Sequence, residues 1–224
     1  MPLLLLIRHG ENDFVKTGKM AGHTPGVHLN ERGKEQAAEL GETLKDVPLA
    51  AIYSSPLERA IETAEPIAQG RELQIQIRPA LIESNIGAWQ GSEIKNVRKL
   101  PEWKMVQNQP SRFRFPDGES FQEMQTRLVN EIESIAKAHQ PEDIVALVFH
   151  SDPIKLVVAY YLGMPLDNFQ RISIDTASVT MLYVSPGGVS LVKQNLRTPF
   201  KFPLPEKRPG KQSILQRILE MFAH

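Results

Sequence analysis

Residues 3 to 11 read Leu-Leu-Leu-Leu-Ile-Arg-His-Gly-Glu, an aliphatic run that stops abruptly at an arginine and a histidine. Consecutive apolar residues without polar alternation are typical of a strand buried on both faces, as in a parallel sheet covered by helices. The run is too short for a signal peptide or a membrane span. We therefore predict a central strand over 3–7 that delivers Arg8, His9 and Gly10 to its carboxyl end.

The same alternation of short apolar runs and amphipathic segments continues along the chain. It predicts further strands at 50–53, 73–77, 144–149, 179–184 and 190–194. It predicts helices at 31–45, 56–68, 120–139 and 153–162. This order indicates one α/β domain over 1–196, a three-layer fold with a mainly parallel central sheet and helices on both faces.

Local start and stop signals accompany the predicted helices, since Ser, Asn and Asp side chains accept hydrogen bonds from the first free N–H groups of a helix. Gly is the usual residue just after a helix ends. The expected N-caps are Asn30, Ser55 in a capping box with Glu58 and with Pro56 at the first helical position, Ser120 in a capping box with Glu123, and Asp152, and the expected stop is Gly163.

Composition narrows the classes of function. The 224 residues contain 26 Lys and Arg against 26 Asp and Glu, so no net positive charge favours nucleic acid or an anionic membrane surface. The absence of cysteine excludes disulfides, thiolate nucleophiles and cysteine-ligated zinc, and is compatible with a reducing compartment. We predict a cytoplasmic protein with no nucleic-acid or membrane partner.

The C-terminal part has a different composition. Residues 197–210 hold four of the 17 prolines together with several basic residues, which is typical of a linker. Beyond the linker, apolar residues recur at helical spacing, which predicts a short amphipathic helix over 211–223. This helix is expected to dock either on its own domain or on a second copy of the chain in a homodimer, rather than on a membrane surface.

Two of the predicted strands end on a histidine, His9 and His150. In open α/β sheets ligands bind at the carboxyl ends of the strands, so these histidines are expected to share one rim. Arg59 follows the strand at 50–53, in the first turn of the next helix, and Glu83 is flanked by apolar residues and glycines.

Read separately, these residues could be core histidines, a solvated arginine and a surface glutamate. Two histidines, two arginines and a carboxylate at one rim, however, are what a phosphoryl-transfer site without a metal needs.

The ordered motifs at 8–11, 29–33 with 36–37, 54–60 with 63–64, Glu83, and the strand that ends at His150 resemble the histidine phosphatase superfamily, also called phosphoglycerate mutase-like. The resemblance spans about residues 3 to 195. It implies that His9 accepts the phosphoryl group and that Arg8, Arg59 and His150 hold its oxygens. Glu83 would protonate the leaving group and then activate water, with no metal and no cofactor. It also implies a small cap formed by residues 14–28 and 84–118, which would set substrate choice.

Two departures from the mutase pattern affect the pocket. Val15 stands where mutases commonly have an asparagine that touches phosphate, and Asn12 is the candidate substitute. The second histidine is followed by Ser151-Asp152 instead of Gly-Gly or Gly-Asn, and Ser151 is a further candidate phosphate-binding residue. Asp152 either caps the next helix or disfavours a highly anionic substrate.

The interval between Glu83 and His150 is shorter than in glycolytic mutases, which favours a phosphomonoesterase acting on a small phosphorylated metabolite. Two alternatives stay open: a cofactor-dependent phosphoglycerate mutase, and an inert module that binds phosphorylated ligands. Basic residues in the interval could grip a second acidic group or form a solvated cap surface; they are Arg98, Lys99, Lys104, Arg112 and Arg114. His23 and His28 are expected near the substrate mouth rather than in a metal site.

Overall fold

The computed structural model describes residues 2–185 and 187–202 of the chain. Its strands are β1 (Leu3–Arg8), β2 (Leu49–Ser54), β3 (Ile75–Ile77), β4 (Ile144–Phe149), β5 (Val179–Ser185) and β6 (Gly188–Leu196). Its α-helices are α1 (Asp13–Thr17), α2 (Glu31–Leu44), α3 (Glu58–Ala68), α4 (Ile94–Val97), α5 (Trp103–Asn108), α6 (Phe121–Lys137) and α7 (Ser151–Tyr161). Short 3-10 turns are η1 (Pro79–Leu81), η2 (Gly87–Trp89), η3 (Pro110–Arg112) and η4 (Leu166–Arg171).

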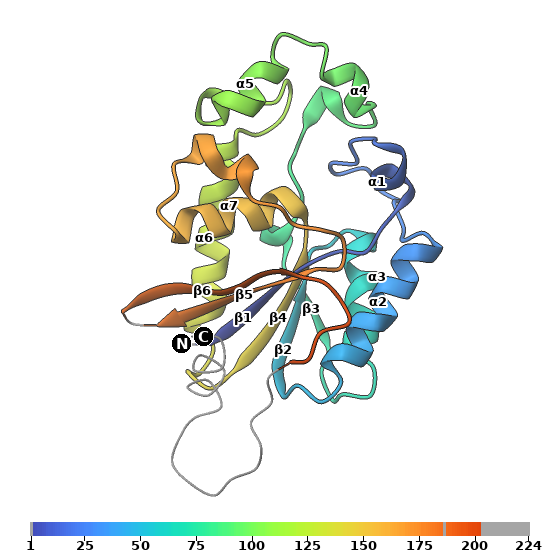
Figure 1. Cartoon of the computed structure of the whole chain (residues 1–224), viewed down its shortest axis with the longest axis vertical. Helices are drawn as coiled ribbons and strands as arrows, with labels where there is room; N and C mark the ends of the chain where they lie inside the picture. Colours follow the sequence, from blue (N-terminus) through green and yellow to red (C-terminus); the bar gives the residue numbers. More distant parts are fainter. Residues whose placement is uncertain (1, 186, 203–224) are drawn as a thin grey trace, which may run out of the picture.

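The six strands form one sheet in the order β3-β2-β4-β1-β5-β6. β1, β2, β3 and β4 are parallel to one another, whereas β5 and β6 add an antiparallel edge. Helices α2 and α3 cover one face and α6 and α7 cover the other (Figure 1). The predicted three-layer α/β fold with a mainly parallel sheet is confirmed.

The first strand is apolar throughout because both of its faces are buried. Leu4 and Leu6 point into the core beneath α6 and α7, and Leu3, Leu5 and Ile7 point into the core beneath α2 and α3. Successive side chains of a strand alternate between faces, so a strand between two helical layers has no position for a polar residue.

Two of the predicted N-caps are confirmed. The Asn30 side chain accepts a hydrogen bond from the Gly33 amide at 2.9 Å and starts α2. At the start of α6, Ser120 Oγ accepts from the Glu123 amide and the Glu123 carboxylate accepts from the Ser120 amide, which completes the capping box. Gly163 lies just beyond α7 with φ +62°, as a helix stop requires.

The N-caps predicted at Ser55 and Asp152 are wrong. α3 begins only at Glu58, because the preceding Leu57 is extended, and Ser55 is directed toward His150 instead. α7 begins at Ser151 with His150 as its N-cap residue, so Asp152 lies inside the first turn, where it pairs with Lys155 Nζ at 2.9 Å. In both places the first residues after the strand lie at the carboxyl end of the sheet, and the helix begins at a different residue from the one predicted.

At the carboxyl ends of the parallel strands, two segments far apart in sequence lie together. Figure 1 shows α1, α4 and α5 beyond this end of the sheet. Backbone hydrogen bonds join the segments: Met20 N to Ser92 O at 2.9 Å, Gly91 N to Met20 O at 2.8 Å and Ile94 N to Gly18 O at 2.8 Å. Residues 14–28 and 84–118 thus form a common layer over the ends of β1 and β4.

After β6 the described chain runs back across the sheet, where Phe202 packs into the core beneath α2 and α3. The helix predicted at 211–223 and most of the linker predicted at 197–210 lie outside the described residues. None of the helices in the described ranges has the length and apolar character that crossing a bilayer requires. The cytoplasmic location and the homodimer stay predictions.

Candidate active site

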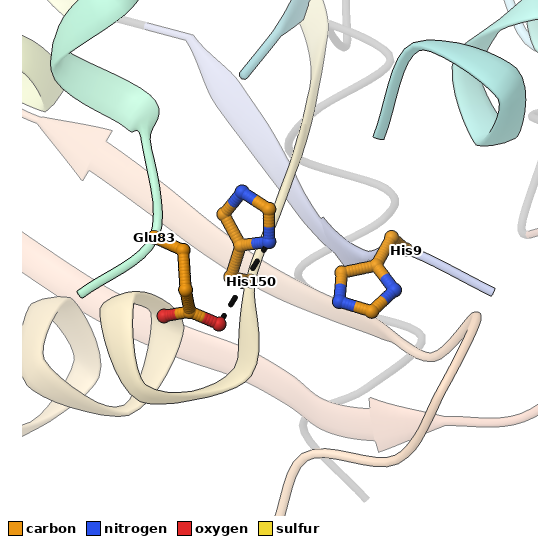
Figure 2. A group of neighbouring side chains, drawn as sticks. All are labelled: His9, Glu83 and His150. Atoms are coloured by element: carbon orange, nitrogen blue, oxygen red, sulfur yellow. Dashed lines mark ion pairs between the residues drawn. The ribbon is translucent and has the colours of Figure 1, made fainter. Parts of the chain in front are cut away.

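His9 and His150 lie side by side because the strands that carry them are neighbours. β1 and β4 are parallel and in register up to the pair Arg8 and Phe149, and the His9 amide donates to Phe149 O at 3.0 Å. The two imidazole rings stand edge to face with centroids 5.2 Å apart (Figure 2). The prediction that the two histidines share one rim is confirmed.

The His9 ring is oriented by the backbone of the next residue. Nδ1 lies 2.7 Å from the carbonyl oxygen of Gly10, and since a carbonyl only accepts, Nδ1 carries the hydrogen. Burial, with Arg59 and Arg8 nearby, lowers the pKa of His9 well below its usual value. The ring is therefore neutral near pH 7, and its Nε2 lone pair is available to attack an electrophile.

Glycine at positions 10 and 33 lets the loop after β1 lie directly on the first turn of α2. A Cβ at Gly10 would lie 2.6 Å from Gly33 O, and a Cβ at Gly33 would lie 2.0 Å from Glu11 O. The Gly10 amide also donates to Thr63 Oγ1 on α3 at 2.9 Å. The loop that carries His9 is thus fixed from two helices.

Arg59 supplies hydrogen-bond donors beside His9. It projects from the first turn of α3, is 1% exposed, and donates from Nη2 to Gly22 O at 2.8 Å. Its Nε and Nη1 atoms are buried and make no hydrogen bond within the described parts of the chain. Buried unpaired N–H groups are costly, so a guanidinium left this way is prepared to bind an anion.

Arg8 contributes in the same manner. Its Nη1 donates to Ile174 O at 2.7 Å, while its buried Nε has no partner among residues 2–185 and 187–202. Burial lowers the pKa of Arg8, and the carboxylates of Glu83, Asp152 and Asp175 oppose this effect. The guanidinium remains charged near pH 7, because arginine starts from a very high pKa.

Asn12 and Ser151, the two less characteristic candidates, also line the pocket. Asn12 is fully buried and caps α1, with Oδ1 accepting from the Val15 amide at 2.9 Å. Its Nδ2 has no hydrogen-bond partner in the described chain and remains a free donor. Ser151 is the first residue of α7, where the helix dipole favours an anion.

Glu83 approaches the histidines from a different element, the loop after η1 (Figure 2). One of its carboxyl oxygens, Oε2, lies 3.8 Å from His150 Nδ1. The other, Oε1, accepts from the amide and hydroxyl of Ser84 at 2.9 and 3.1 Å. Burial first, and then the charge of Asp152, raises the pKa of Glu83, so its carboxyl group holds a proton more readily than an exposed glutamate.

His150 is fully buried and is held by Ser55, whose Oγ lies 2.8 Å from its Nε2. Burial, together with the charges of Arg59 and other neighbours, lowers the pKa of His150 well below its usual value. Its Nδ1 makes no hydrogen bond to any described residue. Ser55 was missed as a site residue because its place before Pro56 reads locally as a helix cap.

A cavity of about 290 Å³ lies between these groups; it is lined by Arg8, His9, Asn12, Arg59, Glu83 and Ser151, and the His150 ring adjoins it through its contact with His9. The layer formed by 14–28 and 84–118 contributes an outer wall, which is largely apolar; its side chains are Val15, Lys19, Met20, Ile86 and Ile94. Asp152 also lines the cavity. The five basic residues proposed to grip a second acidic group, Arg98, Lys99, Lys104, Arg112 and Arg114, are not among the residues that line this cavity.

One potential metal-ligand set falls within the described residues, and it is the site itself. Ligand atoms of His9, Glu83 and His150 lie within 4.8 Å of one another. The guanidinium groups of Arg8 and Arg59 border the same cavity and their positive charge disfavours a cation there. The donor set therefore fits an anion better than a metal ion.

The two loop histidines have separate partners. His23 Nε2 donates to the backbone oxygen of Glu83 at 2.7 Å, so it lies beside the site as expected. His28 pairs with Glu62 at 2.5 Å on the surface. Gly22, whose carbonyl holds Arg59, was missed because a backbone acceptor carries no sequence signal.

Comparison with known proteins agrees with this geometry. The family model of the histidine phosphatase superfamily (branch 1) matches residues 4–197. Phosphoserine phosphatase 1 of Hydrogenobacter thermophilus is 31% identical over 198 residues, which cover 88% of this chain and 93% of that protein. The 2,3-bisphosphoglycerate-dependent phosphoglycerate mutase of Thermoplasma acidophilum is 30% identical over 190 residues, covering 84% of this chain and 90% of the mutase.

Among solved structures, Bacillus stearothermophilus YhfR matches with a TM-score of 0.80 at 30% identity, over 85% of this chain and 95% of YhfR. Of the residues that carry the sequence resemblance, Arg8, His9, Arg59 and Glu83 line one cavity, and the His150 ring contacts His9. The chain belongs to the histidine phosphatase superfamily and is a phosphohydrolase of that superfamily.

Proposed function

We propose that the protein is a metal-independent phosphomonoesterase that hydrolyses a small phosphorylated metabolite through a phosphohistidine on His9. The proposal rests on one observation, the position of three kinds of group around the same cavity. A neutral histidine with a free Nε2 and a carboxyl group of raised pKa border one cavity with two arginines that keep unpaired N–H groups. A nucleophile, a proton donor and anion-binding groups are the parts that phosphoryl transfer requires.

In the first step the substrate phosphoryl group is held by Arg8, Arg59 and His150, with Asn12 and Ser151 as further donors. The Nε2 lone pair of His9 forms a bond to phosphorus while the bond from phosphorus to the leaving oxygen breaks. The Glu83 carboxyl group gives its proton to that oxygen, so the product leaves as an alcohol.

In the second step the Glu83 carboxylate takes a proton from a water molecule that attacks phosphorus. The bond between phosphorus and His9 Nε2 breaks, inorganic phosphate leaves, and Glu83 is protonated again. In the transition state of each step negative charge develops on the phosphoryl oxygens, where the two guanidinium groups stabilise it.

The cavity supports a compact substrate. Its volume of about 290 Å³ lies at the small end of ligand pockets. Residues 14–28 and 84–118 would act as a cap that selects the leaving group, since their side chains make the outer wall. Phosphoserine is a rational first substrate to test, because one relative is named as a phosphoserine phosphatase.

A phosphoglycerate mutase is the alternative that a relative of that name favours. A mutase must also hold a second acidic group of its bisphosphorylated intermediate. Asp152 lines the cavity and disfavours such a group, Lys19 is the one basic side chain that the described outer wall offers it, and the basic residues at 98–114 do not line the cavity. These observations support hydrolysis over isomerisation.

A screen of phosphorylated metabolites, run with a chelator present, tests the proposal. We expect phosphate release by the parent chain and none by His9→Ala, with His28→Ala as a control because His28 is exposed outside the cavity. 3-Phosphoglycerate with a trace of 2,3-bisphosphoglycerate should yield phosphate rather than the 2-isomer. If no phosphomonoester were turned over, the proposal would be wrong and the chain would be an inert module that binds phosphorylated ligands. Conversion of 3-phosphoglycerate to the 2-isomer would instead establish a mutase.

A further inference from the structure

Glu83 stands on a stretch of chain that has no secondary structure of its own. Residues 82–86 form neither helix nor strand. Backbone groups in such a segment depend on partners elsewhere, because unpaired carbonyl and amide groups are costly when buried. The partners of this segment therefore decide where the Glu83 carboxyl group lies.

Arg127 is the first of these partners. It projects from α6 and donates from Nη1 to the carbonyl oxygens of Ala80 at 2.6 Å and Ile82 at 3.1 Å. These carbonyls lie three residues and one residue before Glu83 in the chain. The guanidinium of Arg127, on α6, thus holds the backbone that leads to Glu83 in place.

Glu119 is the second partner, and it acts on the other side of Glu83. Its Oε1 accepts from the Asn85 amide at 2.8 Å and from Arg127 Nη2 at 2.9 Å. Its own amide donates to Asn85 O at 3.0 Å. The two side chains are joined in one ion pair that grips the loop on both sides of Glu83.

The ion pair between Arg127 and Glu119 is largely buried. The side chains of Arg127 and Glu119 are 24% and 16% exposed, and α6 is anchored by fully buried residues such as Phe121 and Leu128. The same region also has an exposed ion pair, Arg114 with Glu123, at 57% and 52%. The exposed pair makes no hydrogen bond to residues 80–85 and provides a matched comparison.

We propose that Arg127 and Glu119 are positioning residues for the reaction, which hold the Glu83 carboxyl group where it can protonate the leaving oxygen. The proposal rests on the proposed function, in which Glu83 is the proton donor. Arg127 and Glu119 do not line the substrate cavity, so they act through Glu83. His23, in the segment 14–28, supports the same loop through its hydrogen bond to the Glu83 carbonyl.

The proposal predicts a dependence on the leaving group. A nitrophenolate departs without a proton, whereas an alkoxide needs one, so misplacing the proton donor slows only substrates with a basic leaving group. The value of kcat/KM reports on steps up to formation of the phosphoenzyme, which is the step that the leaving group affects. A loss of general binding or folding would instead slow all substrates alike.

The experiment measures kcat/KM for p-nitrophenyl phosphate, phenyl phosphate and an alkyl phosphate with Arg127→Met, Glu119→Gln and the control Arg114→Met. For Arg127→Met we expect a loss of about 10- to 100-fold with the alkyl ester and less than about 3-fold with the nitrophenyl ester, the size that small misplacements of a catalytic group produce. Glu119→Gln keeps an acceptor for the Asn85 amide and should give a smaller loss with the same trend. Arg114→Met should match the parent.

Glu83→Gln is the reference, because it removes the proton without removing the side chain. If Arg127 acts through Glu83, adding Arg127→Met to Glu83→Gln should not increase the dependence on the leaving group further. Equal losses for all three esters in folded Arg127→Met, or additive effects in the double variant, would overturn the proposal. If Arg127→Met fails to fold by circular dichroism, the same comparison in Glu119→Gln decides.

The Glu83→Gln variant distinguishes an error in the positioning role from an error in the proposed function. If the parent hydrolyses the esters and Glu83→Gln shows a steep leaving-group dependence while Arg127→Met and Glu119→Gln do not, only the positioning role is wrong. If Glu83→Gln itself shows no such dependence, Glu83 is not the proton donor, and both the assignment and the inference fall.

Discussion

The rings of His9 and His150 meet edge to face at the ends of two adjacent parallel strands, with centroids 5.2 Å apart. Their proximity follows from register, since β1 and β4 pair residue by residue up to Arg8 and Phe149, and a histidine follows each strand. Both rings are buried next to Arg59, which keeps them neutral near pH 7. Since His9 is neutral, its Nε2 can form a bond to phosphorus without first losing a proton, and Arg8 and Arg59 lie beside it to bind the phosphoryl oxygens.

The pH dependence of kcat/KM should reflect His9 and Glu83. The pKa of His9 is lowered, so its protonation limits activity only well below pH 6.5; the pKa of Glu83 is raised above 4.5, so loss of its proton sets the alkaline side. Asp152→Asn removes a negative charge that favours protonation of Glu83. We expect the alkaline limb to move to lower pH in this variant, as measured with a phenyl ester.

Asp46→Asn is the control for that experiment, because Asp46 is exposed after α2 and away from the cavity. Its pH profile should overlay that of the parent. An alkaline limb that stays in place in Asp152→Asn would show that Asp152 does not influence the proton donor.

Loss of the Arg59 guanidinium should weaken both binding and catalysis. Arg59→Met keeps much of the side-chain volume but removes the unpaired N–H groups beside His9, and removal of one such donor group costs on the order of 10²- to 10³-fold in rate. Steady-state kinetics should show a higher KM for substrate and a higher inhibition constant for phosphate. Arg32→Met, at an exposed position on α2, should leave both constants unchanged, and a similar result for Arg59→Met would contradict the phosphate-binding role.

Gly33→Ala should destabilise the fold at the loop that carries His9. The new methyl group would lie 2.0 Å from Glu11 O, so the loop or the start of α2 must move. Overpacking of this kind costs about 1–3 kcal/mol in the free energy of unfolding, which urea denaturation measures. Glu35→Ala on the exposed face of α2 should change it by less than about 0.5 kcal/mol, and equal stability of the two variants would argue against the close packing.

Arg71 offers a stability test far from the site. Its guanidinium donates to Ile67 O at 2.9 Å and Val47 O at 2.6 Å, and it also bonds Leu44 O and Lys45 O after the last turn of α2. Arg71→Ala removes all four bonds from this charged donor, at a cost of about 1–3 kcal/mol, although Val47 O and Leu44 O keep the bonds that they accept from Leu49 N and Val47 N. The free energy of unfolding should fall while kcat/KM stays at the parent value; a loss of activity in the folded variant would show an unexpected link to the cavity.

Sequence was sufficient for the parts of the protein that local chemistry determines. A short unbroken aliphatic run is typical of a strand buried on both faces, so β1 and β4, and with them the positions of His9 and His150, could be predicted. The capping boxes and glycine stops depend on residues three or four apart. For that reason Asn30 and Ser120 were predicted correctly as N-caps.

The remaining features of the site could not be predicted, because they depend on contacts between segments far apart in the chain. Ser55 looks like a helix cap locally, but β2 lies beside β4, and its hydroxyl group is therefore used by His150. The role of Asp152 likewise depends on Lys155 and on the Glu83 loop. Arg127 and Glu119 carry no signal at all in sequence, because their partners are backbone atoms at 80–85.

The phosphoenzyme itself is the most direct test of the account. Glu83→Gln with p-nitrophenyl phosphate should form it, since that leaving group needs no proton, and should hydrolyse it slowly, since the base is missing. Quenched samples analysed by intact mass and peptide mapping should show one phosphoryl group on His9, labile in acid and stable in base, formed together with a burst of nitrophenolate. A phosphoryl group on another residue, or turnover by His9→Ala at the parent rate, would contradict the central claim.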